Sequence, residues 1–197
     1  MVVGITGGIG SGKSTVTSFF KELDNVVLYI ADEEAKQLMN SSSKLREAII
    51  KEFGNETYRD DLLNRNYLSK QVFNNREKLD KLNSIVHPEV HRHFATFLKE
   101  HHRSIIIYEN AILFEIGSDR FCDTIITVYA PEMERIQRVM KRDNTTEKEV
   151  LDRIKNQWKD QKKMMLSNYV ITNNFIDSLH LQVKQIHNIL TKKRNYI

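Results

Sequence analysis

Residues 4–15 of this chain read GITGGIGSGKST and hold five of the seven glycines in a sequence of 197 residues. Gly7 and Gly12, followed by Lys13 and Ser14, fit the spacing of a phosphate-binding loop. Glycine has no Cβ, so such a loop closes tightly and its backbone N–H groups point inward at an anion. The apolar run before it predicts a buried strand, and the apolar residues after it have helical spacing from about Lys13. A glycine-rich turn that fits by chance would lack this context, so the stretch predicts binding of nucleotide phosphates.

The polar residues at the end of the loop are the first candidates for chemistry. In loops of this type the lysine, here Lys13, reaches the β- and γ-phosphates, and the next hydroxyl, here Ser14, ligates Mg²⁺. The positive end of the following helix dipole faces the same anion. The loop alone leaves GTPases, ATPase motors and small-molecule kinases open. No Asn-Lys-x-Asp stretch that would specify guanine occurs, and the chain is small for a motor, so a small-molecule kinase is favoured.

Length and composition predict one α/β domain with an inserted lobe or lid. Hydrophobic residues make up 40% of the chain, enough for a core, and no apolar stretch approaches the ~20 residues that span a bilayer. No signal segment is recognisable before the loop, and the single cysteine forms no internal disulfide, so we expect a cytoplasmic protein without a membrane partner. This residue, Cys122, stands before an apolar run, which favours buried packing over reactivity.

The formal net charge of +4 at pH 7 allows two interpretations. Basic proteins bind nucleic acid, but a site for polyphosphate substrates also collects Lys and Arg. No basic stretch is interleaved with aromatic residues and no recognition motif occurs, so we expect no nucleic-acid partner. The sequence leaves the oligomeric state open between a monomer and a weak homo-oligomer.

Apolar runs that predict strands alternate with helical patterns along the chain. The runs cover residues 2–5, 26–30, 104–109, 123–129 and 169–171. This alternation predicts a parallel sheet with helices on both faces, formed by a core of about residues 1–40 and 103–197. Residues 41–102 are helical in pattern throughout and predict a lobe that carries substrate specificity. The polar helical stretch of residues 142–163 stands where a mobile lid over the phosphates would lie.

Two clusters of side chains on predicted helices admit a functional and a structural interpretation. The first consists of four histidines on what the pattern predicts as one helical stretch: His91, His93, His101 and His102. Metal binding is one interpretation, but their spacing does not bring them together on one helix face. A surface or packing role is therefore favoured.

The second cluster is formed by Arg135, Arg138 and Arg142, whose spacing of three and four residues puts them on one side of a helix. A solvated helix face explains them without any function. The alternative is that they hold the charge that develops on a transferred phosphoryl group, since their helix follows a strand and leads into the predicted lid. We favour this functional role for Arg142.

Asp32 is the first carboxylate after the second predicted strand. The ends of parallel strands in such sheets face the ligand crevice, so an acceptor hydroxyl could approach this residue. Its structural alternative is the N-cap of the following helix, a position for which aspartate is well suited. Both roles can hold at once, and we favour an active-site role.

Stretches along nearly the whole chain resemble the dephospho-CoA kinase family and occur in its order: GITGGIGSGKST, IADEEAKQL, LLNRNYLSKQVF, LNSIVHPEV, AILFE, RVMKRD and RIKNQ. The resemblance implies transfer of the ATP γ-phosphoryl group to the ribose 3′-hydroxyl of dephospho-CoA. It also implies a five-stranded parallel sheet with strand order 2-3-1-4-5. The alternatives are another small-molecule or nucleoside-monophosphate kinase, and a non-catalytic regulator that responds to nucleotide.

The resemblance assigns roles to individual residues. The ATP phosphates would be surrounded by Gly8, Gly10, Ser11, Gly12, Lys13, Ser14 and Thr15, with Mg²⁺ on Ser14. Asp32 would take the acceptor hydroxyl. Dephospho-CoA would be received in the lobe by Arg65, Asn83, His87 and Pro88. Arg142 would be a lid arginine near the ATP phosphates, and Asn173 would lie near the adenine.

The chain departs from the family pattern at three places. Ile30 replaces the first aspartate of an Asp-Ala-Asp segment, which removes one possible contact to Mg²⁺ or water. Glu109 replaces the aspartate of Asp-x-Pro-Leu-Leu-Phe-Glu, and this longer carboxylate could still serve the substrate site. Ser167 and Asn168 stand where an Ala-Asp pair is usual. These changes concern the surroundings of the metal more than the reaction.

Overall fold

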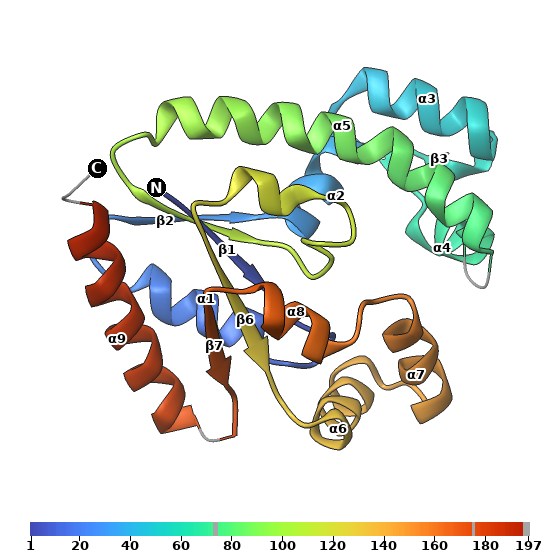
Figure 1. Cartoon of the computed structure of the whole chain (residues 1–197). Helices are drawn as coiled ribbons and strands as arrows, with labels where there is room; N and C mark the ends of the chain where they lie inside the picture. The colour runs from blue at the N-terminus through green and yellow to red at the C-terminus, as the bar shows by residue number, and fades with distance from the viewer. Residues whose placement is uncertain (73–74, 175, 195–197) are drawn as a thin grey trace. The chain divides into compact units, whose positions relative to one another are not determined.

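A computed structural model describes residues 1–72, 75–174 and 176–194. The chain divides into two compact units (Figure 1). The first, here the sheet unit, comprises residues 1–30 and 101–197, and the second, here the helical unit, comprises residues 31–100.

The sheet unit is built on five parallel strands. They are β1 (Val2–Thr6), β2 (Val26–Ile30), β5 (Ile105–Glu109), β6 (Thr124–Tyr129) and β7 (Tyr169–Thr172). Their order in the sheet is β2-β5-β1-β6-β7, with all pairs parallel. Counted along the chain, this is the predicted order 2-3-1-4-5, which is therefore confirmed. β1 and β5 are buried along their whole length, as expected of continuous apolar runs covered on both faces.

Helices of the sheet unit pack against its strands (Figure 1). The helical segments of this unit are α1 (Lys13–Lys21), the 3₁₀ segment η2 (Ser118–Phe121), α6 (Glu132–Asp143), α7 (Glu147–Lys155), α8 (Asp160–Leu166) and α9 (Ile176–Arg194). α1 and α9 pack on each other and share one core with the sheet, to which they contribute Phe20 and Leu190. A second, smaller core joins α6 to α7 through Val139 and Val150.

The turn between α6 and α7 is set by local sequence. α6 ends at Asp143, and its C-cap Asn144 adopts the left-handed conformation with φ of 49°. Asparagine tolerates this conformation better than most residues, because its side chain forms local hydrogen bonds. α7 then starts with a capping box, in which the Thr146 side chain accepts from the Glu149 N–H and the Glu149 carboxylate accepts from the Thr146 N–H.

The helical unit contains α2 (Ala31–Ser41), α3 (Ser43–Phe53), the 3₁₀ segment η1 (Asn55–Thr57), α4 (Arg65–Val72) and α5 (Arg76–Glu100). α2 packs against α5, and Nδ1 of His93 lies 3.6 Å from Oε2 of Glu34. The Tyr58 hydroxyl also donates to the Met39 carbonyl at 2.6 Å. Because of these contacts α2 belongs to the helical unit, which begins at Ala31, whereas the sequence placed the start of the lobe at about residue 41.

Two details of the helical unit differ from the sequence expectations. The segment expected to be wholly helical contains a short antiparallel hairpin of β3 (Tyr58–Arg59) and β4 (Leu62–Leu63). Its turn residues Asp60 and Asp61 both have positive φ, as a type I′ turn requires, but lack the glycine that normally reveals such a turn. The four histidines do not share one helix, because α5 ends at Glu100, before His101 and His102. Within the described parts of the chain, no helix combines the length and the apolar character needed to cross a membrane.

Candidate active site

The loop between β1 and α1 turns tightly, with positive φ at Gly7, Gly10 and Gly12. α1 begins at Lys13, as predicted, and its N-cap Gly12 is left-handed with φ of 95°. A Cβ at this position would lie 2.0 Å from Nδ2 of Asn173, so only glycine fits. The helix N-terminus therefore opens directly onto the loop, and its N–H groups and dipole favour a bound anion there.

The side chain of Lys13 folds over the loop. Its Nζ donates to the carbonyl oxygens of Gly7 and Gly8, at 3.0 and 3.3 Å. Ser14 is exposed and Thr15 half-buried in the first turn of α1, while Ser11 is fully buried. The ammonium group and two hydroxyls thus lie at the helix N-terminus, where phosphate oxygens would be bound.

Asn173 holds the loop from the end of β7. Its Nδ2 donates to the Ser11 carbonyl at 2.8 Å, and its own N–H donates to the Tyr129 carbonyl at 2.8 Å. Arg138 donates to the Asn173 carbonyl at 3.2 Å. The sequence placed Asn173 near an adenine, whereas in the structure its buried side chain contacts the backbone of the phosphate loop.

A buried carboxylate contacts Thr17, which lies one helical turn from Ser14. Glu109 is the last residue of β5 and pairs in register with Ile5 of β1. The Thr17 hydroxyl lies 3.1 Å from Oε2 of Glu109 and 3.0 Å from the Ser14 carbonyl. Ser14 and Thr17 are three residues apart and therefore share one side of α1. A hydroxyl and a nearby carboxylate are hard oxygen donors, the set that suits Mg²⁺ when phosphates supply the remaining ligands.

The arginines of α6 have different environments. Arg142 is exposed, and its Nε and Nη2 donate to the two carboxylate oxygens of Asp143 at 2.7 and 3.1 Å. This contact raises the pKa of Arg142 and lowers the pKa of Asp143 to about 2. Arg153 of α7 donates to the same carboxylate at 2.6 Å, so Asp143 ties α6 to α7.

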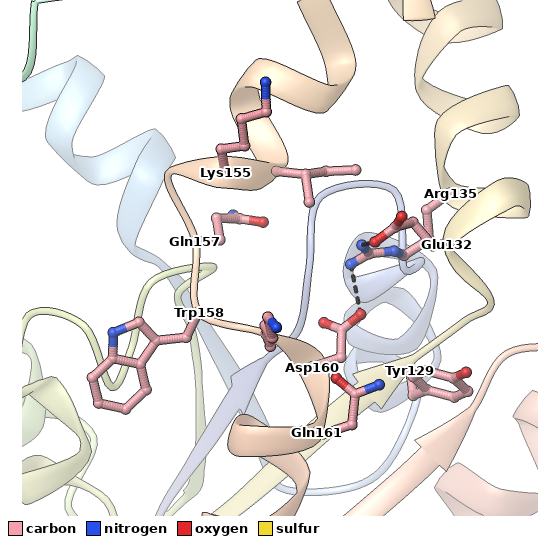
Figure 2. Close-up of a pocket in the computed structure, with 10 residues that line it drawn as sticks. Tyr129, Glu132, Arg135, Lys155, Gln157, Trp158, Asp160 and Gln161 are labelled. Carbon is pink, nitrogen blue, oxygen red and sulfur yellow. Dashed lines mark ion pairs between the residues drawn. The ribbon is translucent and has the colours of Figure 1, made fainter. Parts of the chain in front are cut away.

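Arg135, in contrast, is buried. Its Nη1 lies 2.8 Å from Oδ2 of Asp160, at the start of α8 (Figure 2). Both residues line a pocket of about 500 Å³, together with Tyr129, Trp158 and other residues around the beginning of α8. The sequence favoured Arg142 over Arg135, because spacing along one helix does not reveal which side chain is buried.

The candidate residues for the second substrate lie in the helical unit. Asp32 is exposed and lies inside the first turn of α2, which begins at Ala31. The N-cap role considered for Asp32 is therefore wrong. Arg65 is exposed at the first residue of α4, and its guanidinium makes no ion pair or hydrogen bond within the described parts of the chain. Asn83 and His87 are half-buried on α5 and four residues apart, hence on one side of that helix.

His87 is the most perturbed of these groups. Its Nε2 is buried and has no hydrogen-bond partner among the residues that the structure describes, and its ring stacks on His91 at 6.3 Å. Burial and the neighbouring His91 lower the pKa of His87, while Asp32 opposes this shift electrostatically. Asp32 and His87 are therefore near enough to interact, so the helical unit brings together two of the predicted acceptor residues.

Comparison with known proteins gives a consistent result. Residues 1–177 match the family model described as dephospho-CoA kinase. A dephospho-CoA kinase from Salinibacter ruber is 40% identical over 178 residues, which cover 87% of each chain. Among solved structures, the protein TT1252 from Thermus thermophilus is 29% identical, with a TM-score of 0.80 over 96% of this chain and 97% of that one. A dephospho-CoA kinase from Campylobacter jejuni shares the fold at 20% identity, with a TM-score of 0.62 and 95% of each chain covered.

Proposed function

The chain belongs to the dephospho-CoA kinase family, whose phosphotransferase activity is the final step of coenzyme A biosynthesis, and we propose how its candidate residues carry out this activity. The observation that carries the proposal is the position of Lys13. Its ammonium group is hydrogen-bonded to the loop at the N-terminus of α1. The ammonium charge and the helix dipole both favour the binding of negatively charged nucleotide phosphates there.

Phosphoryl transfer depends on positioning and charge neutralisation more than on covalent help. The inward N–H groups of the loop, Lys13 and the dipole of α1 bind the ATP phosphates. Ser14 would hold Mg²⁺ through its hydroxyl, and the Glu109 carboxylate, which contacts Thr17, would orient water around the ion. When bound, the metal ion neutralises charge between the β- and γ-phosphates. Arg142 adds positive charge once it leaves Asp143.

The acceptor is received by the helical unit. Asp32 orients the ribose 3′-hydroxyl of dephospho-CoA and takes its proton late in the transfer, because a loose transition state requires little activation of the nucleophile. Arg65 binds a phosphate of the acceptor, since a guanidinium fork matches phosphate oxygens. Asn83 and His87 contact the acceptor from one side of α5. We expect the protein to be a cytoplasmic monomer or weak homo-oligomer that uses only small-molecule substrates.

Residues 142–163 form the lid in this proposal. The segment is polar and starts at the end of α6, where Asp143 binds both Arg142 and Arg153. Hydrogen exchange in this segment is expected to slow when a non-hydrolysable ATP analogue and dephospho-CoA are added together. Exchange that does not change would identify α7 as an ordinary surface helix.

A panel of acceptors tests the function. Purified protein is incubated with ATP, Mg²⁺ and either dephospho-CoA, AMP, shikimate or no acceptor, and ADP release is measured. Release only with dephospho-CoA supports the proposal. Release with AMP or shikimate supports another small-molecule kinase, and nucleotide binding without any release supports a regulator. Lys13→Ala is the control for contaminating kinases, because it removes the charge that binds the phosphates while leaving the core untouched.

A further inference from the structure

The phosphate loop is held on its outer side by side chains from elements that follow it in the chain. Asn173 binds the Ser11 carbonyl, as described above, and Oε1 of Gln157 accepts from the Ile9 N–H at 2.8 Å. The third contact is made by Arg135 of α6 against Gly8. Unlike the other two, it involves a buried charge, and it leaves no room for a side chain at position 8 of the loop.

Arg135 is nearly inaccessible to solvent, with 3% of its surface exposed. Its partner Asp160 is also largely buried, and their charged groups face each other in Figure 2. Nε of Arg135 and Oδ1 of Asp160 are buried without a hydrogen-bond partner among the described residues. Burying a pair of charges is costly, and removal of either partner would leave the other uncompensated. Each of the two charges therefore depends on the other for its compensation.

The guanidinium group occupies the space in which a side chain at position 8 would lie. A Cβ on Gly8 would be 1.5 Å from Nη1 of Arg135, 2.7 Å from its Cζ and 2.9 Å from Oδ1 of Asp160. Gly8 is not among the glycines with positive φ, so its backbone conformation does not require glycine. What requires glycine at position 8 is the close approach of Arg135.

The backbone of α6 approaches the loop in the same way two residues later. A Cβ on Gly10 would lie 2.6 Å from the carbonyl oxygen of Arg135 and 2.9 Å from Cγ2 of Val139. Helix α6 therefore contacts the loop at Gly8 with a side chain and at Gly10 with its backbone. Both contacts set the path of the loop between β1 and α1, on which the direction of its N–H groups depends.

We propose that Arg135, held by Asp160, is a positioning residue that fixes the phosphate loop in its ATP-binding conformation, and that position 8 is glycine to admit the guanidinium. The proposal rests on the proposed role of the loop as the ATP-phosphate site. Arg135 acts through the backbone of Gly8. Its loss affects ATP binding and leaves the binding of dephospho-CoA to the helical unit unchanged.

Steady-state kinetics of Arg135→Gln and Asp160→Asn test this role. Misplacing a binding group by a fraction of an ångström is costly, so we expect Arg135→Gln to raise KM for ATP about 10- to 100-fold. KM for dephospho-CoA should stay within about twofold, the scatter of surface substitutions. The double variant should be less impaired than the product of the single effects, because both changes break one contact. Ile136→Val on the same helix is the control for stability, and it should lower Tm without changing KM for ATP.

Gly8→Ala gives a second and more specific test. In the wild-type background the new methyl group collides with Arg135, and KM for ATP should rise strongly. In an Arg135→Ala background the space is open, so the same change at Gly8 should have little further effect. Equal losses in both backgrounds would overturn the proposal. If Gly8→Ala does not fold on its own, folding restored by Arg135→Ala supports the proposal and failure of both variants to fold counts against it.

Calorimetric titration with ATP separates this inference from the function on which it rests. Wild-type protein that binds no ATP would remove the proposed function. Wild-type protein that binds ATP while Arg135→Gln binds it equally well, with a lower Tm, would remove only the positioning role. Weaker binding by Arg135→Gln and partial recovery in Arg135→Lys, which keeps the charge but not the planar group, would support it.

Discussion

The Thr17 hydroxyl lies 3.1 Å from Oε2 of Glu109 in the interior of the sheet unit, and so connects the second turn of α1 to the end of β5. Glutamate is one methylene longer than the aspartate of the family pattern, and its carboxylate contacts α1 through Thr17. Through Thr17, Glu109 is connected to the turn of α1 that carries Ser14. The departure from the family pattern therefore leaves a carboxylate at the proposed metal site.

The first prediction concerns this carboxylate. Glu109→Gln keeps an acceptor for Thr17 but removes the negative charge, so the enzyme should require more Mg²⁺. Residues that orient metal ligands typically contribute 10- to 100-fold, and we expect the Mg²⁺ concentration for half-maximal activity to rise by about 10-fold. A Mg²⁺ titration at saturating ATP measures it. Thr17→Val is the control that breaks the hydrogen bond and keeps the charge; a wild-type Mg²⁺ dependence in Glu109→Gln would exclude the role.

A second prediction concerns Arg65, whose exposed guanidinium has no ion pair within residues 1–72, 75–174 and 176–194. Arg65→Ala should raise KM for dephospho-CoA much more than KM for ATP, because a phosphate contact is lost only with the acceptor. Tm should hardly change, as for most surface substitutions. Arg59→Ala, also exposed in the helical unit, serves as the matched control. Equal changes in both KM values would argue against a role in acceptor binding.

The third prediction concerns Cys122, which is half-buried and donates to the Ser118 carbonyl at 3.8 Å. Burial, with the charges of Asp119 and Asp123 adding to it, raises the pKa of this thiol from 9.0 to about 12. Since the thiolate is the reactive form, a disulfide reagent at pH 8 should react with the native protein at least about 100-fold more slowly than with the unfolded chain. Rapid native labelling would contradict the buried environment that the sequence predicted.

The same shift has a consequence for stability. The folded pKa of Cys122 lies above the unfolded value, so the unfolded chain loses this proton first as pH rises. The contribution of the protonated thiol to the free energy of unfolding is complete below pH 9 and is lost between pH 9 and about 12. The denaturant midpoint should therefore decrease less from pH 8 to pH 10 in Cys122→Ala than in the wild type. An identical fall in both proteins would show that the thiol does not contribute.

Much of the sheet unit could be predicted from the sequence, because buried parallel strands appear as continuous apolar runs between polar residues. The predicted strand at residues 26–30 matches β2, and the helix after the loop starts at Lys13 as expected. The hairpin of β3 and β4 was missed because its turn, Asp60 and Asp61, adopts positive φ without glycine. The sequence signal for a turn was present only as two adjacent short polar residues.

The contacts between distant segments could not be predicted from the sequence. Arg135 and Arg142 have the same helical context, and only the fold determines that Arg135 meets Asp160 while Arg142 meets its neighbour Asp143. Likewise, Asn173 reaches the loop because β7 lies beside β6, which lies beside β1. Motif spacing identifies the residues of a site, but the residues that hold it in place depend on strand order and burial.

The last prediction concerns Asp32, for which the structure removes the helix-cap alternative, since α2 begins at Ala31 and Asp32 lies inside its first turn. Asp32→Asn keeps the size of the side chain and loses its charge. If Asp32 positions the acceptor hydroxyl and takes its proton, kcat should fall by about 10²–10³, the lower part of the range for general bases, because the transition state is loose. KM for ATP and Tm should stay near their wild-type values. Glu33→Gln is the matched control, since Glu33 is an exposed acid in the same turn and shares any interaction with the helix dipole. Loss of kcat in Asp32→Asn but not in Glu33→Gln would identify a role in the transfer step, whereas full activity in both would move the search for the proton acceptor to Glu109.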